Sequence, residues 1–149
     1  MQGKICVITG ANTGIGKAAA EALSRLGAHV VLVCRNREKG ARALADLTAA
    51  AAKGGRGGSA ELRIADLSSQ TGVRRVASEL LAAHPAIHVL VNNAGLALKQ
   101  RELTVDGIER TFAVNYLACF MLANLLLPAL RAAGNARIVN VSSEAHAGA

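Results

Sequence analysis

A glycine-rich turn near the amino terminus constrains the fold of this chain more than any other sequence feature. Residues 9–17 read TGANTGIGK and connect an apolar run, Ile5 to Thr9, to a segment whose apolar residues recur at helical spacing. Glycine lets the backbone approach a pyrophosphate closely, and the unpaired amides at a helix N-terminus attract its negative charge. A strand, a glycine turn and a helix in this order therefore predict a nucleotide-binding unit.

Two better-known glycine motifs do not fit this turn. A P-loop would need glycine where Ala11 stands and serine or threonine where Ala18 stands. The spacing of Gly10, Gly14 and Gly16 also differs from the GxGxxG fingerprint of the larger dinucleotide dehydrogenases. Taken alone, the glycines could equally form an ordinary tight turn.

Short runs rich in β-branched residues recur along the chain and predict five strands. The runs are Ile5 to Thr9, Val30 to Val33, Ile87 to Val91 and Ile138 to Val141, with a weaker one at Leu62 to Ala65. Apolar stripes at helical spacing separate them, which implies right-handed crossovers and a parallel sheet covered on both faces. We expect one α/β domain over residues 1–149, a doubly wound sheet of the Rossmann type.

Several residues mark the expected ends of the helices. Gly27 follows the first helix, Pro85 closes the third, and Asp106 with Glu109 forms a capping arrangement that opens a fourth, longer helix. Pro128 should interrupt the later part of that helix. The glycine-rich segment from Lys53 to Ser59 lies within the alternating pattern, so we expect a loose surface loop there.

Composition excludes several classes of partner. The net charge is +7, but the basic residues are dispersed and no aromatic side chains interleave with them, which argues against nucleic acid. The apolar run from Leu117 to Leu130 is too short to span a membrane and is interpreted as a buried helix. Residues 1–3 leave no room for a signal peptide, so we expect an intracellular, cytoplasmic protein without a membrane anchor.

The cysteines and histidines show no metal-ligand spacing. Cys6, Cys34 and Cys119 are far apart and form no CxxC pair, so reduced intracellular thiols are expected. The histidines fall on different elements without acidic partners at ligand spacing, so we expect no metal site. They are His29, His84, His88 and His146.

Further motifs appear at the ends of the expected strands, in a fixed order. Thr9 to Gly16 fits TGxxxGIG, Asp66-Leu67 follows the third strand, and Asn92 to Gly95 follows the fourth. Asn115 lies in the long helix, and Ser142-Ser143 ends the fifth strand. Over nearly its whole length the chain resembles the short-chain dehydrogenase/reductase family. Residues 101–107 and 142–146 look most like the branch that contains retinol dehydrogenases and protochlorophyllide reductases.

The resemblance implies a cofactor site made by residues from three strand ends. Gly10, Gly14 and Gly16 would shape the pyrophosphate turn together with Asn12, Thr13 and Ile15; Asp66 and Leu67 would flank the adenine; Asn93, Ala94 and Gly95 would line the ribose side. Each match also has a simpler interpretation. Asp66 could cap the helix that begins near Thr71, and Asn92-Asn93 could be turn residues.

The second strand ends in Cys34-Arg35-Asn36-Arg37, without the acidic residue that would bind the adenosine ribose of NAD. Arg35 can form charge-assisted hydrogen bonds to a phosphate, worth about 1.5 to 3 kcal/mol. NADP(H) is therefore the expected cofactor, with NAD(H) as the alternative. Lys17 could add to this positive site or be an ordinary surface lysine.

By resemblance, Asn115 and Ser143 are the catalytic residues present, although Ala118 stands where the family pattern has glycine. The family's Tyr-x-x-x-Lys pair is missing, because the single tyrosine, Tyr116, is followed four residues later by Phe120. We therefore expect an NADP-dependent oxidoreductase of alcohols or carbonyls, seen as its cofactor-binding part and inactive alone. The alternatives are a non-catalytic NADP(H)-binding or regulatory short form and, more remotely, a flavodoxin-like protein. A homo-oligomer is compatible with both the oxidoreductase and the short form.

Overall fold

The computed structural model describes residues 1–52 and 56–144. Five parallel strands form one sheet in the order β3-β2-β1-β4-β5. They are β1 (Ile5–Thr9), β2 (His29–Cys34), β3 (Ser59–Ile64), β4 (Val89–Asn92) and β5 (Arg137–Asn140). The chain order reverses between β1 and β4, which is the topological switch point where nucleotides bind in such sheets. The predicted doubly wound architecture is confirmed.

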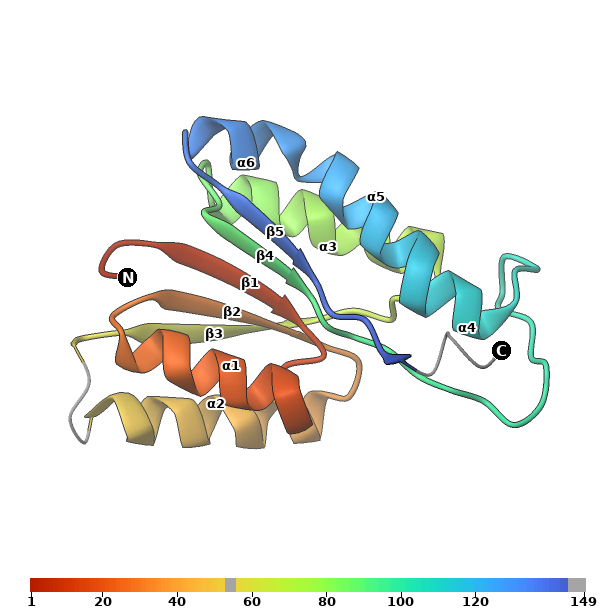
Figure 1. Ribbon diagram of the computed structural model, residues 1–149, viewed down its shortest axis with the longest axis horizontal. Coiled ribbons are helices and arrows are strands. Elements are labelled where there is room, and N and C mark those ends of the chain that lie inside the picture. Colours follow the sequence, from red (N-terminus) through yellow and green to blue (C-terminus); the bar gives the residue numbers. More distant parts are fainter. Residues whose placement is uncertain (53–55, 145–149) are drawn as a thin grey trace.

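Helices cover both faces of the sheet (Figure 1). On one face lie α1 (Gly14–Arg25) and α2 (Arg37–Ala52), and on the other lie α3 (Gln70–Ala83), α5 (Ala118–Leu125) and α6 (Leu127–Ala132). A short helix, α4 (Arg110–Phe112), and a single π-helical turn, η1 (Ala113–Leu117), lead directly into α5.

Strand residues alternate between two apolar cores. Val31 and Val33 of β2 pack toward α3 and α5, whereas Val30 and Leu32 pack on the side of α1 and α2. All four are essentially inaccessible to solvent, and burial of each such side chain stabilises the fold by about 1.5 to 3 kcal/mol. The aliphatic composition therefore fills both layers without large aromatic side chains.

Two strands have other bounds than predicted, because pairing with the neighbouring strands sets where they begin and end. The weak third run begins at Ser59, because β3 pairs with β2 residue by residue from His29↔Ser59 onward. The fourth begins at Val89, where pairing with β1 starts, and continues to Asn92, which pairs with Asn140.

The glycine-rich segment is not a loose loop where the structure describes it. Its first part, Lys53 to Gly55, lies outside the described residues. The Arg56 amide donates to the Arg25 carbonyl at 3.2 Å, and a Cβ on Gly58 would collide with the Ser24 carbonyl. The described part is therefore held against the end of α1.

The expected role of Asp106 is wrong. Glu109 does cap α4, since its carboxylate accepts from the Thr111 and Phe112 amides at 2.8 and 2.7 Å. Asp106 instead accepts from the backbone amide of Gln70, the first residue of α3, at 2.8 Å. The pattern resembles a local capping box, but the Asp106 carboxylate reaches the N-terminus of the neighbouring helix, α3.

Pro128 interrupts the long helix as predicted, because α5 ends at Leu125 and α6 begins at Leu127. The run is also less buried than expected: Phe120 is 58% exposed. Among the helices described, none has the length and apolar character needed to cross a membrane.

The histidines fall on different elements as expected, but two of them share an acidic partner in space. His29 and His84 lie together with Glu61 because β2 and β3 are neighbours and α3 ends beside them. Their spacing in the sequence gave no indication of this contact.

Candidate functional site

The predicted nucleotide residues gather where the strand arrows end in Figure 1, at the carboxyl edge of the sheet. The turn after β1 is fastened to both neighbouring strands. The Gly10 amide donates to the Val33 carbonyl of β2 at 2.8 Å, and the Asn93 side-chain amide donates to the Thr9 and Gly10 carbonyls at 2.9 and 3.3 Å. These bonds fix the turn across the switch point of the sheet.

The Thr9 hydroxyl holds this arrangement together through hydrogen bonds, a role that was not predicted from the sequence. Its hydroxyl accepts from the backbone amides of Asn93 and Ala94 at 3.0 and 2.9 Å and donates to the Val91 carbonyl at 3.4 Å. The residue is only 1% exposed. A threonine at the first position of TGxxxGIG was the available signal, but its partners lie on a distant strand.

Close packing requires glycine at two positions of the turn. Gly10 has a φ of +66°, and a Cβ there would lie 2.9 Å from the Ala94 Cα. A Cβ on Gly16 would overlap the Asn93 side-chain amide and approach the Gly10 carbonyl oxygen to 2.6 Å. Both glycines therefore let α1 and the end of β4 approach the turn.

The N-terminus of α1 is open to solvent. Thr13 is the N-cap residue but its side chain makes no capping hydrogen bond, whereas Ser69 caps α3 through the Gly72 amide at 3.3 Å. Gly14 has a φ of +54°, and a Cβ there would meet no atom within 4 Å. Unpaired amides facing open space fit an anionic group such as a pyrophosphate.

The remaining turn residues border this opening. Ile15 is 69% exposed, Thr13 is exposed and Asn12 is partly exposed. An apolar side chain so exposed beside free amides is available to contact a bound molecule. These three residues remain predicted ligand contacts.

Two basic residues near the turn differ in their surroundings. Arg35 is exposed directly after β2, the strand that anchors the glycine turn. Lys17 bonds to Asp46 of α2 at 2.5 Å and lies 3.9 Å from Glu21. The hydrogen bond to Asp46 raises the pKa of Lys17 above its usual value. Lys17 thus belongs to an ion pair on the surface, and a contribution of Lys17 to the phosphate site remains a prediction.

Asp66 does not cap the following helix. Its carboxylate accepts from the Ser68 amide and hydroxyl at 2.9 and 2.8 Å, and Ser69 is the N-cap of α3. The Asp66 bonds form a tight turn that turns Leu67 inward, where it is 9% exposed. The helix-cap alternative for Asp66 is therefore wrong, and its predicted contact with adenine remains a prediction.

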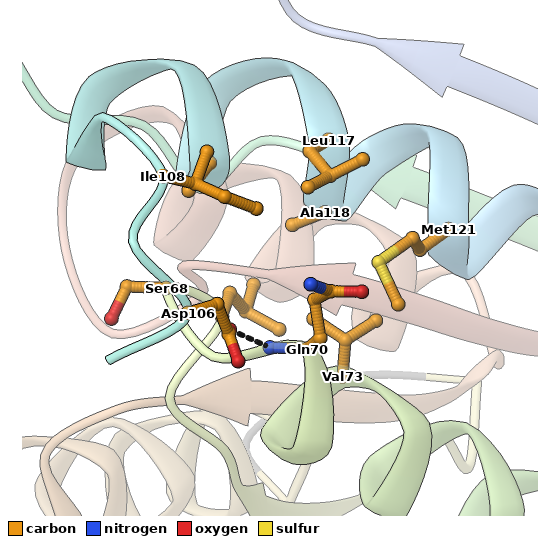
Figure 2. A pocket seen from close by; sticks show the side chains of 10 residues that line it. Ser68, Gln70, Val73, Asp106, Ile108, Leu117, Ala118 and Met121 are labelled. Carbon is orange, nitrogen blue, oxygen red and sulfur yellow. Dashed lines mark hydrogen bonds between the residues drawn. The ribbon is translucent and has the colours of Figure 1, made fainter. Parts of the chain in front are cut away.

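Figure 2 shows a small pocket beside this turn, between α3 and the η1–α5 helix. Ser68, Gln70 and Asp106 lie on one side, while Leu117, Ala118 and Met121 form an apolar side. Its empty space is about 180 Å³ and includes open solvent, so it is not an enclosed ligand cavity. The pocket lies where the segment before α4 contacts α3.

The two predicted catalytic residues lie at the same edge. Asn115 belongs to η1, and π-helical turns are frequent at functional sites. Its side chain bonds to both backbone groups of Leu96, accepting from the amide at 2.9 Å and donating to the carbonyl at 2.8 Å. Ser143 is exposed beyond β5, whose parallel pairing with β4 carries it toward the same edge. Both roles remain predictions.

Gly95 and the single tyrosine complete the predicted positions. A Cβ on Gly95 would lie 3.6 Å from the Asn115 Oδ1, so this glycine is next to the η1 turn. Tyr116 stacks on Phe112 with ring centroids 5.1 Å apart and is 60% exposed. Tyr116 therefore packs against Phe112 on the outer side of the helix.

The cysteines of the described chain are free thiols. Burial raises the pKa of Cys6 and of Cys34 to about 11, so neither is a thiolate at neutral pH. Burial also raises the pKa of Cys119. Cys6 and Cys34 fill core space, whereas Cys119 is only partly buried.

Comparisons with known proteins agree with this geometry. A family model described as short chain dehydrogenase matches residues 4–148. Retinol dehydrogenase 12 of Bos taurus is 43% identical over 144 residues, covering 97% of this chain and 44% of the relative. The chain thus spans less than half the length of this curated relative.

Solved structures of other proteins share the fold. A metagenomic short-chain oxidoreductase in complex with NADP has a TM-score of 0.82 and 37% identity, covering 95% of this chain and 63% of that chain. An NAD+-bound xylitol dehydrogenase has a TM-score of 0.79 and 26% identity, covering 98% of this chain and 55% of that chain.

Proposed function

This chain belongs to the short chain dehydrogenase family, and from that premise we propose that it is the nucleotide-binding part of an NADP(H)-dependent oxidoreductase. Its substrate class is an alcohol or the corresponding carbonyl compound. The relatives that act on retinol make an apolar alcohol the first substrate to test.

The open N-terminus of α1 carries the proposal. The first turn of this helix has no side-chain cap, Gly14 and Ile15 in it are exposed, and the turn before it is locked to β2 and β4. A pre-ordered set of donors loses little entropy on binding, so a pyrophosphate would gain most of the available interaction energy there. α3 does not offer the same donors, because Ser69 already caps it.

Arg35 supports a preference for the 2′-phosphate of NADP. It is exposed at the end of β2, and the residues that follow are Asn36 and Arg37 instead of an acid. The Asn36 side chain accepts from the Lys39 amide at 2.9 Å and so caps the start of α2. Asn36 is thereby occupied, and we assign the phosphate contact to Arg35, the first exposed residue after β2. The family fold itself accepts either nucleotide, since the xylitol dehydrogenase holds NAD+.

The residues at this edge have distinct tasks in the proposed reaction. When bound, the nicotinamide supplies the hydride chemistry, and the protein contributes orientation and electrostatics. Asn93, Ala94 and Gly95 would position the ribose side of the nucleotide. Ser143 would hold the substrate oxygen, and Asn115 would keep the Leu96 turn in place beside it.

Calorimetric titration of the chain with NADPH and with NADH tests the proposal. We expect saturable NADPH binding that weakens tenfold to a hundredfold in Arg35→Ala, the loss of one charge-assisted contact, with NADH binding unchanged. Arg42→Ala is the matched control, because Arg42 is exposed on α2 and pairs only weakly with Glu38 at 3.9 Å. Equal losses in both variants would reduce the effect to overall charge, and absence of binding by the folded chain would refute the proposal.

One observation favours a second candidate, a nucleotide-binding form without turnover. The single tyrosine of the 149 residues stacks on Phe112 and lacks a lysine four residues later. The coding sequence downstream of Ala149 distinguishes the two. A reading frame that continues into a Tyr-x-x-x-Lys motif would support the first candidate, and a stop codon there would support the second.

The long helix also supports self-association. Phe112, Tyr116 and Phe120 are 51%, 60% and 58% exposed and recur every four residues along α4, η1 and α5. A stripe of exposed aromatic side chains is typical of protein interfaces. Light scattering after size exclusion should give a mass above that of one chain, and Phe120→Glu should return it to 15.3 kDa.

A further inference from the structure

A second group of polar side chains lies at the opposite end of the strands from the nucleotide turn. His29 is the first residue of β2, Glu61 lies within β3, and His84 directly follows α3. One ligand atom from each of the three lies within 4.8 Å of the other two. Two imidazoles and a carboxylate form a donor set that binds zinc in proteins.

The sheet explains why the three meet. His29, Val31 and Val33 share the face of β2 that packs toward α3, and Glu61 is paired with Val31 on the neighbouring strand. His84 is the C-cap residue of α3, so its ring lies beside this edge. All three ligands are therefore held by elements of the core.

The distances are close to those of a tetrahedral site. The His84 Nε2 lies 2.7 Å and the His29 Nε2 lies 4.0 Å from the same oxygen of Glu61. Ligand bonds of about 2.0 to 2.1 Å place neighbouring donors of a tetrahedral zinc roughly 3.4 Å apart. The observed separations lie on either side of this value, so side-chain shifts of less than about 1 Å would complete the site.

Further contacts hold two of the ligands in place. The His29 Nδ1 lies 2.7 Å from the Ser59 hydroxyl, which leaves its Nε2 directed toward Glu61. Arg63 lies 3.1 and 3.2 Å from the two oxygens of Glu61. Metal-binding histidines and carboxylates usually have such outer hydrogen bonds, which fix the ring orientation.

The group is partly withdrawn from water. The side chain of His84 is 11% exposed, and those of His29 and Glu61 are each 26% exposed. The remaining exposure leaves room for a water molecule as fourth ligand. Among the described residues, Arg63 is the one arginine or lysine that contacts the Glu61 carboxylate, and its positive charge would weaken metal binding without occupying the histidines.

We propose that His29, Glu61 and His84 bind a divalent transition metal ion of the zinc class. The ion would join the starts of β2 and β3 to the end of α3. Because β3 is an edge strand of the sheet, this link would stabilise the edge. The proposal is independent of nucleotide binding at the other end of the strands.

Titration of the untagged, EDTA-treated chain with ZnCl₂, followed by calorimetry, tests the site. We expect about one zinc per chain, a dissociation constant in the micromolar range or below, and visible absorption bands of four-coordinate cobalt when CoCl₂ replaces zinc. His84→Gln keeps a hydrogen-bond donor for Glu61 but provides no zinc ligand of the imidazole type. It should weaken zinc binding at least tenfold, and Glu61→Gln should do the same.

Two controls separate this site from other zinc ligands and from loss of folding. In the original chain, His88 Nδ1 accepts a hydrogen bond from the Ile5 amide at 3.0 Å. His88→Asn retains an acceptor for this amide and should bind zinc like the original chain. Arg63→Gln should bind more tightly. Zinc should raise the thermal midpoint of the original chain and of His88→Asn but not of His84→Gln. No saturable binding, or zinc binding by His84→Gln and Glu61→Gln as tight as that of the original chain, would overturn the proposal and leave the cluster as a hydrogen-bonded ion-pair network.

Discussion

Replacement of Thr9 by valine tests how the nucleotide turn is held. The two side chains are nearly isosteric, so the change removes the hydroxyl while keeping the space filled. It leaves the backbone amides of Asn93 and Ala94, which bond to that hydroxyl at 3.0 and 2.9 Å, without their partner. The Thr9 side chain is buried, so water does not replace it without a rearrangement.

The magnitude follows from these two bonds. Each buried donor left unpaired costs about 1 to 3 kcal/mol, so Thr9→Val should lower the free energy of unfolding by about 2 to 6 kcal/mol. Movement of the turn to find new partners would bring the loss toward the lower end. The same movement would displace the α1 amides and weaken NADPH binding.

Urea unfolding followed by circular dichroism measures the effect, with midpoints compared at equal slope. Thr48→Val is the matched control: its hydroxyl donates to the Leu44 carbonyl at 2.9 Å on an exposed helix position, so its loss should stay within about 0.5 kcal/mol. If Thr9→Val unfolds within that same range, the hydroxyl does not hold the turn, and the reasoning is refuted.

Three further results are expected. Gly16→Ala should lower the thermal midpoint and abolish NADPH binding in calorimetry, because its Cβ would overlap the Asn93 side chain; retention of both would show that α1 has room to shift. Two backbone amides at the start of α4 lower the pKa of Glu109, so its stabilising contribution is present above its ordinary value of 4.5 and is lost as the pH falls through the lowered one. Between pH 3 and 6, roughly the range in which carboxylates titrate, the unfolding midpoint should depend less on pH in Glu109→Gln than in the original chain. An unchanged pH profile would contradict this. Cys6 and Cys34 should resist iodoacetamide in the native chain near pH 8 (below an ordinary thiol pKa of about 8.5) and react fully in denaturant, as counted by mass spectrometry; native labelling would show that their strands open.

Most of the fold could be predicted from local patterns in the sequence. The apolar runs of β1 and β2 are buried on both faces, so they read as continuous strands, and Gly27 ends α1 with a φ of +90°. The glycines of the nucleotide turn could also be predicted, because glycine is the residue that a positive φ or a close backbone approach requires.

Contacts between distant segments could not be predicted in this way. Asp106 and Glu109 fit a local capping pattern, yet the partner of Asp106 is the Gln70 amide, 36 residues away. The Thr9 hydroxyl binds amides 84 and 85 residues later. The contact of His29 and His84 with Glu61 likewise depends on which strands are neighbours, and no single segment encodes that.

Nuclear magnetic resonance of the ¹⁵N-labelled chain during NADPH titration tests the central claim most directly. We expect the amide resonances of Gly14, Ile15 and Gly16 to shift saturably, while the Gly72 amide, which bonds to the Ser69 hydroxyl, stays in place. Shifts confined to other parts of the chain, or none at saturating NADPH, would show that the open end of α1 does not bind the nucleotide.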